Sequence, residues 1–257
     1  MPGCSDASYA GVVDLGLSGK AFVVTGGSDG LGYASARELL REGAAVTVSS
    51  RSHTKVADAV HRLGAEWPGA VEGVAADNGD PAAAERIVAS AITRWGKLDG
   101  LVISVGGPPT STALGAADVD WESSFKSVFL GAIRLIRAAA PVLPEGGAVI
   151  LVLSTSAKSP LTGLGLSNGL RPGLAMAAKD IADELGPRGV RVVSLMPGLF
   201  NTARGAGAAD RELGNIPLRR IGEPAEFGRA VAFLASPAAS YITGCAIAVD
   251  GGALRAL

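Results

Sequence analysis

Residues 25–32, Thr-Gly-Gly-Ser-Asp-Gly-Leu-Gly, combine residue types that can hold a phosphate group. The segment follows an apolar run at residues 21–25 and opens a segment of helical period. Its glycines permit a tight turn and let the backbone approach a pyrophosphate, whose charge is met by free N–H groups and the positive end of the helix. In isolation such a string also fits an ordinary turn, and its place between strand and helix favours the phosphate interpretation.

The elements that position this segment alternate along the chain from Lys20 onward. Short apolar runs, typical of strands buried on both faces, alternate with longer segments of helical period, which predicts βαβ units. Right-handed crossovers then give an α/β fold, a Rossmann-type doubly wound sheet of seven parallel strands flanked by helices in a single domain. The predicted strands are 21–25, 45–50, 71–76, 100–105, 148–154, 190–195 and 245–249, and the predicted helices are 30–41, 55–63, 82–94, 119–140, 174–185 and 224–234.

The composition of the 257 residues, 48% of them hydrophobic, fits one large α/β domain. Residues 1–14 lack periodicity, and we interpret them as a flexible extension before a dinucleotide-binding domain at 15–257. The stretch 199–218, rich in Gly, Ala and Arg, is the candidate for a mobile lid over a pocket.

The charge pattern limits the classes of partner that the chain is expected to bind. The net charge is −1 with Lys and Arg scattered along the chain, so we expect a small-molecule substrate and no nucleic-acid or membrane partner. No apolar stretch is long enough to span a bilayer and no secretory signal opens the chain. Cys4 and Cys245 form neither a disulfide framework nor a metal spacing. These observations indicate a soluble cytoplasmic protein without a metal site.

Several motifs in fixed order resemble the short-chain dehydrogenase/reductase family, of the length of its 3-oxoacyl-reductase-like members. The motifs are the glycine spacing of residues 26–32, Asp77 after the third predicted strand, Pro197-Gly198 with Thr202, and the C-terminal segments 220–224, 241–244 and 249–252. The resemblance covers about residues 15–252. It implies a nicotinamide dinucleotide cofactor, and a homotetramer or homodimer built through helices 119–140 and 174–185.

The resemblance also implies a set of cofactor-binding residues in this chain. They lie in the glycine-rich loop, after the second, third, fourth and sixth predicted strands, and at one catalytic position. The set is Gly26, Ser28, Asp29, Gly30, Leu31, Gly32, Ser50, Arg51, Asp77, Asn78, Ser104, Val105, Gly106, Arg171, Pro197, Gly198, Leu199 and Thr202.

Ser50 and Arg51 decide which dinucleotide fits. Enzymes that use NAD usually place an acidic residue at the end of the second strand, where it accepts from the ribose hydroxyls. A hydroxyl beside a forked, charged guanidinium suits a 2′-phosphate instead, so NADP(H) is favoured over NAD(H). Asp29 argues the other way, because many NADP-binding relatives carry a basic residue there. Arg51 as a solvated charge at a strand end is the alternative reading.

The family's catalytic tetrad of Asn, Ser, Tyr and Lys does not carry over intact. Aligning residues 149–154 with the family's fifth strand puts Ser154 at the serine, Ser167 at the tyrosine and Arg171 at the lysine, while Val128 takes the asparagine position. Sliding the register does not restore the pair, since no tyrosine of this chain is followed four residues later by lysine: they are Tyr9, Tyr33 and Tyr241.

The consequence is a site without the usual proton relay. A serine hydroxyl is a much weaker acid than a phenol, so Ser167 is a poor general acid. Arg171 stays protonated, yet its fork can fix ribose hydroxyls or polarise a substrate oxygen. Ser154 can donate to that oxygen as one arm of an oxyanion site. Pro172 breaks helical hydrogen bonding, so we expect the helix to start close to Asn168 or to be kinked there.

Several functions fit this pattern. The first is an NADP-dependent reductase acting on a fairly apolar carbonyl, imine, enone or quinone that needs little acid catalysis; residues 107–109 and the 199–218 stretch would form the pocket walls. The second is an NADP(H)-binding sensor or partner subunit without turnover. The third is a lyase, because a serine and arginine pair on this fold resembles halohydrin dehalogenases, although those keep the tyrosine and lose the glycine loop. Ser154, Ser167 and Arg171 can also simply tie strand, loop and helix together.

Overall fold

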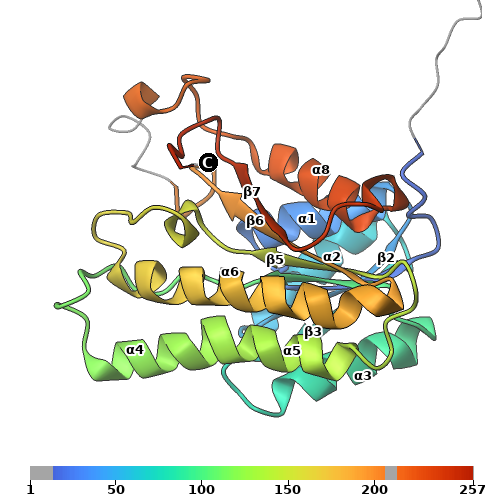
Figure 1. Ribbon diagram of the computed structural model, residues 1–257. Coiled ribbons are helices and arrows are strands. Elements are labelled where there is room, and N and C mark those ends of the chain that lie inside the picture. The colour runs from blue at the N-terminus through green and yellow to red at the C-terminus, as the bar shows by residue number, and fades with distance from the viewer. Residues whose placement is uncertain (1–13, 206–212, 257) are drawn as a thin grey trace, which may run out of the picture.

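The computed structural model describes residues 14–205 and 213–256, and a seven-stranded parallel sheet forms its centre (Figure 1). The strands are ordered β3-β2-β1-β4-β5-β6-β7. The central strands β1, β4 and β5 are buried along their full length, as strands covered on both faces are, whereas the edge strands β3 and β7 are only partly buried. Their bounds are β1 Ala21–Thr25, β2 Ala45–Ser50, β3 Val71–Ala75, β4 Gly100–Ser104, β5 Ala148–Val152, β6 Arg191–Pro197 and β7 Cys245–Val249.

Helices cover both faces of the sheet, as Figure 1 shows. One layer holds α1, α2 and α8, and the other holds α3, α6 and a long helical segment made of α4, a π-helical stretch and α5. The bounds are α1 Gly30–Arg41, α2 His53–Glu66, α3 Ala83–Trp95, α4 Asp118–Ser124, the π-helix Phe125–Leu130, α5 Gly131–Ala139, α6 Gly165–Leu185 and α8 Pro224–Ala235.

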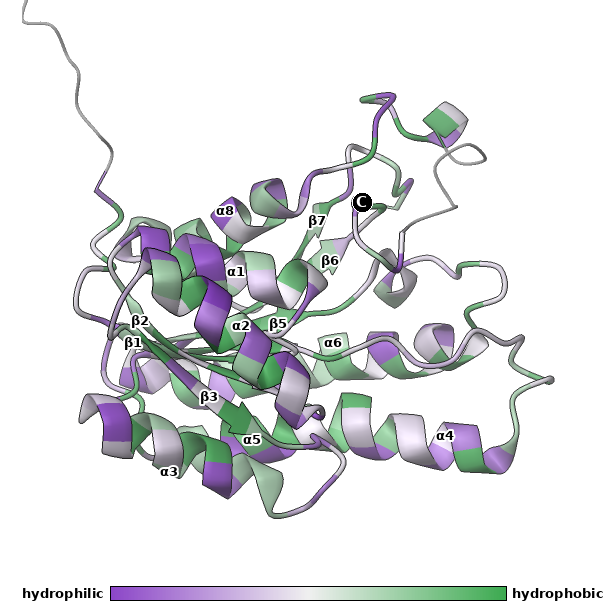
Figure 2. Cartoon of the chain, turned by 180° about the vertical axis from the view of Figure 1, so that it is seen from behind, coloured by the Kyte–Doolittle hydropathy of each residue, from purple (hydrophilic) through white to green (hydrophobic). Residues whose placement is uncertain are grey.

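The sheet separates two apolar cores. Leu135 of α5 and Leu174 of α6 belong to one core, and Leu39 of α1 and Phe227 of α8 belong to the other. A fully buried side chain of this kind contributes about 1.5–3 kcal/mol relative to exposure. In Figure 2 the helices carry both purple and green segments, which is typical of helices that turn one apolar face to a sheet. The predicted fold class is confirmed.

Parallel strands bring the functional loops to one edge of the sheet. Thr25 pairs with Ile103, Ser104 with Val152, and Val152 with Leu195, so the carboxyl ends of β1, β4, β5 and β6 lie side by side. The strand order reverses at β1, whose neighbours are β2 and β4. In open α/β sheets a ligand crevice forms outside the carboxyl ends at such a switch point.

The start of α6 differs from the sequence expectation. The helix begins at Gly165 rather than near Asn168. The Gly165 N–H donates to the Ser111 carbonyl at 2.7 Å, and the Asn168 side chain exchanges two hydrogen bonds with the backbone of Leu161. These contacts fix the first turn before Pro172, whose missing N–H leaves only one helical hydrogen bond unmade.

Two sequence expectations fall on segments that the structure does not describe. The proposed extension lies outside the described residues except for Asp14, and the proposed lid includes residues 206–212, which are also outside them. Within the described part of the chain, no helix is both long and apolar enough to cross a bilayer, and no cluster of three or more His, Cys, Asp or Glu side chains could hold a metal ion.

Candidate functional site

The glycine-rich loop forms a tight turn between β1 and α1. Gly26 has φ +60°, and a β-carbon there would lie 2.3 Å from the Ser104 carbonyl oxygen, so only glycine fits. Above Gly30 the space is open, because a β-carbon would meet only the Thr202 methyl carbon, at 3.8 Å. Asp29 is the N-cap of α1 and its carboxylate accepts from the Gly30 N–H at 2.7 Å. The loop therefore leaves open space above the N-terminus of α1.

The residues at the ends of β2 and β4 fit a dinucleotide. The Ser49 and Ser50 hydroxyls are buried without a hydrogen-bond partner among the described residues, and Arg51 beside them is exposed. Unpartnered buried hydroxyls suit the sugar and phosphate oxygens of a nucleotide. At the end of β4, a β-carbon on Gly106 would meet nothing within 4 Å, so this edge also has room for a ligand. The end of β2 therefore has hydroxyl groups that could bind the cofactor, and the end of β4 has space for it.

The remaining predicted cofactor residues shape the walls of this edge. Ser104 ends β4, and its carbonyl accepts from the Thr25 hydroxyl at 3.1 Å. The Asp77 carboxylate accepts from the Gly79 N–H at 2.9 Å, which holds the turn containing Asn78 after β3. The structure brings the others to the same edge: Ser28, Leu31 and Gly32 around the glycine loop, Val105 after β4, and Pro197, Gly198, Leu199 and Thr202 at the end of β6.

Arg62 is a charged residue at this site that the sequence reasoning missed. It lies on α2, and its guanidinium donates to the Ser28 carbonyl at 3.3 Å. The same guanidinium lies over the Tyr33 ring at 4.3 Å from the centroid. Arg62 therefore adds a positive charge beside the glycine-rich loop. Its position on the exposed face of a helix gave no sequence signal, because charged residues are normal there.

Three serines meet where β5 ends and α6 begins. The Ser154 hydroxyl oxygen accepts from the Ser156 N–H at 3.1 Å, which leaves the Ser154 hydroxyl proton free to donate. The Ser156 and Ser167 hydroxyls form a buried hydrogen bond of 2.9 Å. Ser167 is thus paired with Ser156, a residue that the sequence reasoning did not select. Its signal was available as a hydroxyl two positions beyond Ser154.

Arg171 is a buried cation on the second turn of α6. It is 4% exposed and its Nη1 donates to the Val152 carbonyl at 2.7 Å. Its Nε is buried without a partner among the described residues. Burial, together with the charge of Arg204, lowers the pKa of Arg171 to about 10, so the guanidinium still carries its charge at neutral pH. Val152 pairs with Ser104, so Arg171 lies at the edge formed by β4 and β5.

Val128 occupies the position where the family resemblance implies asparagine. It is buried within the π-helical stretch Phe125–Leu130, in which the Gly131 N–H donates to the Lys126 carbonyl five residues back. Such single-turn widenings in a helix are often found at functional sites. Here the widening occurs with an apolar side chain, so Val128 brings no polar group to the site.

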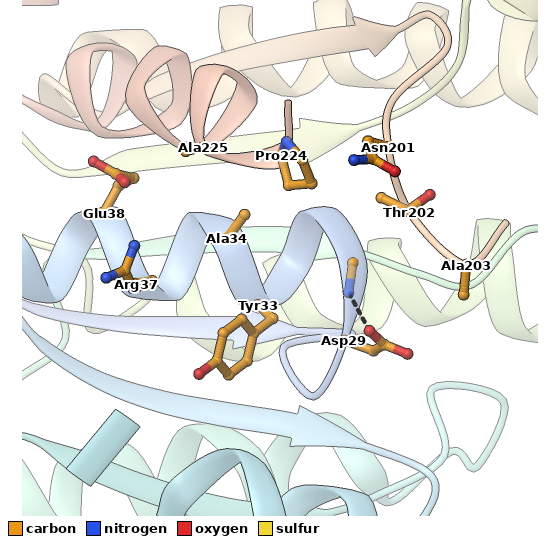
Figure 3. A pocket seen from close by; sticks show the side chains of 11 residues that line it. Asp29, Tyr33, Ala34, Arg37, Glu38, Asn201, Thr202, Ala203, Pro224 and Ala225 are labelled. Carbon is orange, nitrogen blue, oxygen red and sulfur yellow. Dashed lines mark hydrogen bonds between the residues drawn. The ribbon is translucent and has the colours of Figure 1, made fainter. Parts of the chain in front are cut away.

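The cavity drawn in Figure 3 has a volume of about 510 Å³ and lies between α1, α8 and the loop after β6. Asp29, Gly30 and Thr202 line one part of it, and Arg37 and Glu38 line another. It therefore adjoins the glycine-rich loop, whereas Ser154, Ser167 and Arg171 are not among its lining residues. The sequence prediction places the cofactor phosphates beside this glycine-rich loop.

The fold and the glycine-rich edge define a doubly wound α/β protein of the dinucleotide-binding type. A family model described as enoyl-(acyl carrier protein) reductase matches residues 26–253. The chain is also 36% identical over 248 residues to dehydrogenase/reductase SDR family member 4 of Oryctolagus cuniculus, with 92% of this chain and 94% of the relative covered. This chain belongs to the short-chain dehydrogenase/reductase family.

Two solved structures are similar over nearly the whole chain. One is L-sorbose reductase from Gluconobacter frateurii, in complex with NADPH and L-sorbose, with a TM-score of 0.88, 30% identity, and 95% of this chain and 100% of that chain covered. The other is a short-chain oxidoreductase from Pseudomonas aeruginosa PAO1, described as containing an atypical catalytic center, with a TM-score of 0.88, 30% identity, and 94% and 99% covered.

Proposed function

We propose that this oxidoreductase transfers hydride between NADP(H) and a small, largely apolar carbonyl, imine, enone or quinone, without a tyrosine and lysine proton relay. Two observations carry the proposal: the buried guanidinium of Arg171 donates to the carbonyl of Val152, and Ser154, two residues further along the chain, has a hydroxyl proton free to donate. Both lie at the sheet edge that holds the glycine-rich loop. The NADPH complex of the similar L-sorbose reductase supports the cofactor class.

In this proposal the chain's own residues stabilise charge on the substrate oxygen. The reduced nicotinamide supplies the hydride when it is bound. Ser154 donates its proton into a hydrogen bond to this oxygen, and Arg171 adds a fixed positive charge near it. The oxygen then takes its proton from water, because the Ser167 hydroxyl is too weak an acid and is paired with Ser156.

NADPH is expected to bind more tightly than NADH. Arg51 and Arg62 supply positive charge near the end of β2 and the glycine loop, where a 2′-phosphate adds a charge-assisted hydrogen bond. Arg51→Ala is expected to weaken NADPH binding by roughly 1–3 kcal/mol and leave NADH unchanged. Fluorescence titration of both cofactors measures this, with Arg41→Ala at the far end of α1 as the control. Equal affinities in the unmutated protein would exclude the preference.

A homodimer or homotetramer through the α4–α5 segment and α6 is our proposal for the assembly. These helices lie side by side on one face (Figure 1), and Val119, Phe125 and Met176 on them are 69%, 41% and 72% exposed. Apolar side chains gathered on one helical layer favour self-association. Light scattering is expected to give a dimer or tetramer, and Met176→Glu is expected to shift it toward monomer. A monomeric unmutated protein would contradict the proposal.

A nucleotide-binding protein without turnover is the second candidate. It is favoured by the engagement of Ser167 with Ser156 and of Arg171 with the Val152 carbonyl, which are contacts that a purely structural cluster would also make. Both candidates bind NADPH, and only the first oxidises it. Monitoring NADPH absorbance with a panel of carbonyl, imine, enone and quinone compounds therefore separates them.

A further inference from the structure

A second arginine lies at the same sheet edge as Arg171. Arg204 follows β6 in a turn held by hydrogen bonds from the Gly205 N–H to Thr202. Its Nη2 is 3.4 Å from the Pro108 carbonyl, in the loop after β4. Arg171 donates to Val152, which pairs with Ser104 at the end of β4, and Arg204 contacts the loop that follows β4.

Gly107 makes room for the Arg204 guanidinium. A β-carbon at Gly107 would lie 1.7 Å from Arg204 Nη1 and 2.0 Å from its Cζ, which no side chain could tolerate without displacing the arginine. The same loop continues to Ser111, which bridges to Leu164 at the start of α6. The loop after β4 therefore holds Arg204 in the region of Ser167 and Arg171.

The two cations have no anionic partner in the described part of the chain. None of the ion pairs among these residues includes Arg171 or Arg204. The Nε of Arg171 is buried and unsatisfied, and the charge of Arg204 contributes to the lowered pKa of Arg171. Arg171 is buried, and a buried cation is costly unless an opposite charge accompanies it, whereas Arg204 is exposed to solvent. A ligand anion bound between the two guanidinium groups would offset their repulsion.

We propose, building on the hydride-transfer function above, that the substrate carries a carboxylate beside its reducible group and that Arg204, together with Arg171, binds this carboxylate. The fork of a guanidinium matches a carboxylate with two parallel hydrogen bonds. The substrate is then an oxo acid with an otherwise apolar body. Arg204 sets the specificity for the acid, and Arg171 contacts both the carboxylate and the reacting oxygen.

The test compares one acid with its uncharged ester. Phenylglyoxylate and methyl phenylglyoxylate share the same body. Calorimetry first measures NADPH binding, and then measures the binding of each compound to protein saturated with NADP⁺, which cannot reduce it. The acid is expected to bind on the order of 10- to 100-fold more tightly than the ester, the range for a hydrogen bond to a charged group. Arg204→Gln is expected to lower this preference to a few-fold, the part that Arg171 still supplies, and to leave the affinity for the ester unchanged.

Gly107→Ala gives an independent test, because it displaces the Arg204 guanidinium without changing any charge. It is expected to lower the preference for the acid as Arg204→Gln does. The controls are Arg41→Gln, and Gly64→Ala on α2, where a β-carbon would meet nothing within 4 Å. Both controls are expected to keep the preference.

The outcomes separate this proposal from the hydride-transfer function on which it rests. Equal binding of acid and ester, no binding of either, or a preference that is undiminished in Arg204→Gln overturns the carboxylate proposal. If the ester is nevertheless reduced by NADPH, hydride transfer stands and only the substrate class fails. If the unmutated protein does not bind NADPH in the first step of the same experiment, the proposed function itself fails.

Discussion

Arg171→Ala is expected to lower kcat/KM by roughly 10³-fold and to weaken NADPH binding at the same time. One preorganised donor to a developing oxyanion is worth about 10²–10³-fold in rate, and a charged donor lies at the upper end of that range. The effect on binding follows because the second-turn position of α6 places the guanidinium at the edge where the cofactor is proposed to bind. Steady-state kinetics and cofactor titration on the same samples measure both losses.

Arg171→Met distinguishes a functional arginine from a structural one. The guanidinium is 4% exposed without a charged partner among the described residues, so its burial costs stability that a long apolar side chain would not. The free energy of unfolding is therefore expected to stay constant or to rise in Arg171→Met, while activity is lost. If Arg171→Met loses both its fold and its activity, the main role of Arg171 is to connect α6 to β5 through its hydrogen bond to Val152.

Ser154→Ala is expected to lower the rate of hydride transfer roughly 10²-fold, because it removes one oxyanion-type donor. Ser167→Ala is expected to change the rate little, since its hydroxyl is a weak acid bonded to Ser156. It removes one buried hydrogen bond, so a loss of about 1 kcal/mol in stability is expected instead. Single-turnover NADPH oxidation and chemical denaturation of the two variants measure these effects. If Ser167→Ala lowers the rate and Ser154→Ala does not, the catalytic residue is Ser167 and not Ser154.

The strands and the first helix were predictable because their signals are local. Four of the expected strand or helix ranges, 21–25, 45–50, 245–249 and 30–41, agree with β1, β2, β7 and α1 residue for residue. A strand buried on both faces needs a continuous apolar run, and the glycine loop marks the start of α1. The start of α6 was not predictable, since it is fixed by the Ser111 carbonyl, which is distant in sequence.

The candidate site was predictable in outline and not in its contacts. Family spacing placed Ser154, Ser167 and Arg171 near one edge, and the parallel register brings them there. Which hydroxyl Ser167 bonds, and that Arg171 has an unpartnered nitrogen, depend on packing between elements. Arg204 was missed because it lies in an irregular loop, and its partner Gly107 follows another strand. Neither residue has a sequence period that marks it.

The central claim is hydride transfer without a side-chain proton relay, and the pH dependence of single-turnover NADPH oxidation tests it most directly. The pKa of Arg171 is lowered only to about 10, so its charge is retained below that pH, and Ser167 stands where the family's tyrosine would be. The rate is therefore expected to be flat from about pH 6 to 9, where a phenol of lowered pKa would register. A rate that falls as pH rises through this window would contradict the account, because it would reveal a protein group that must be protonated to react.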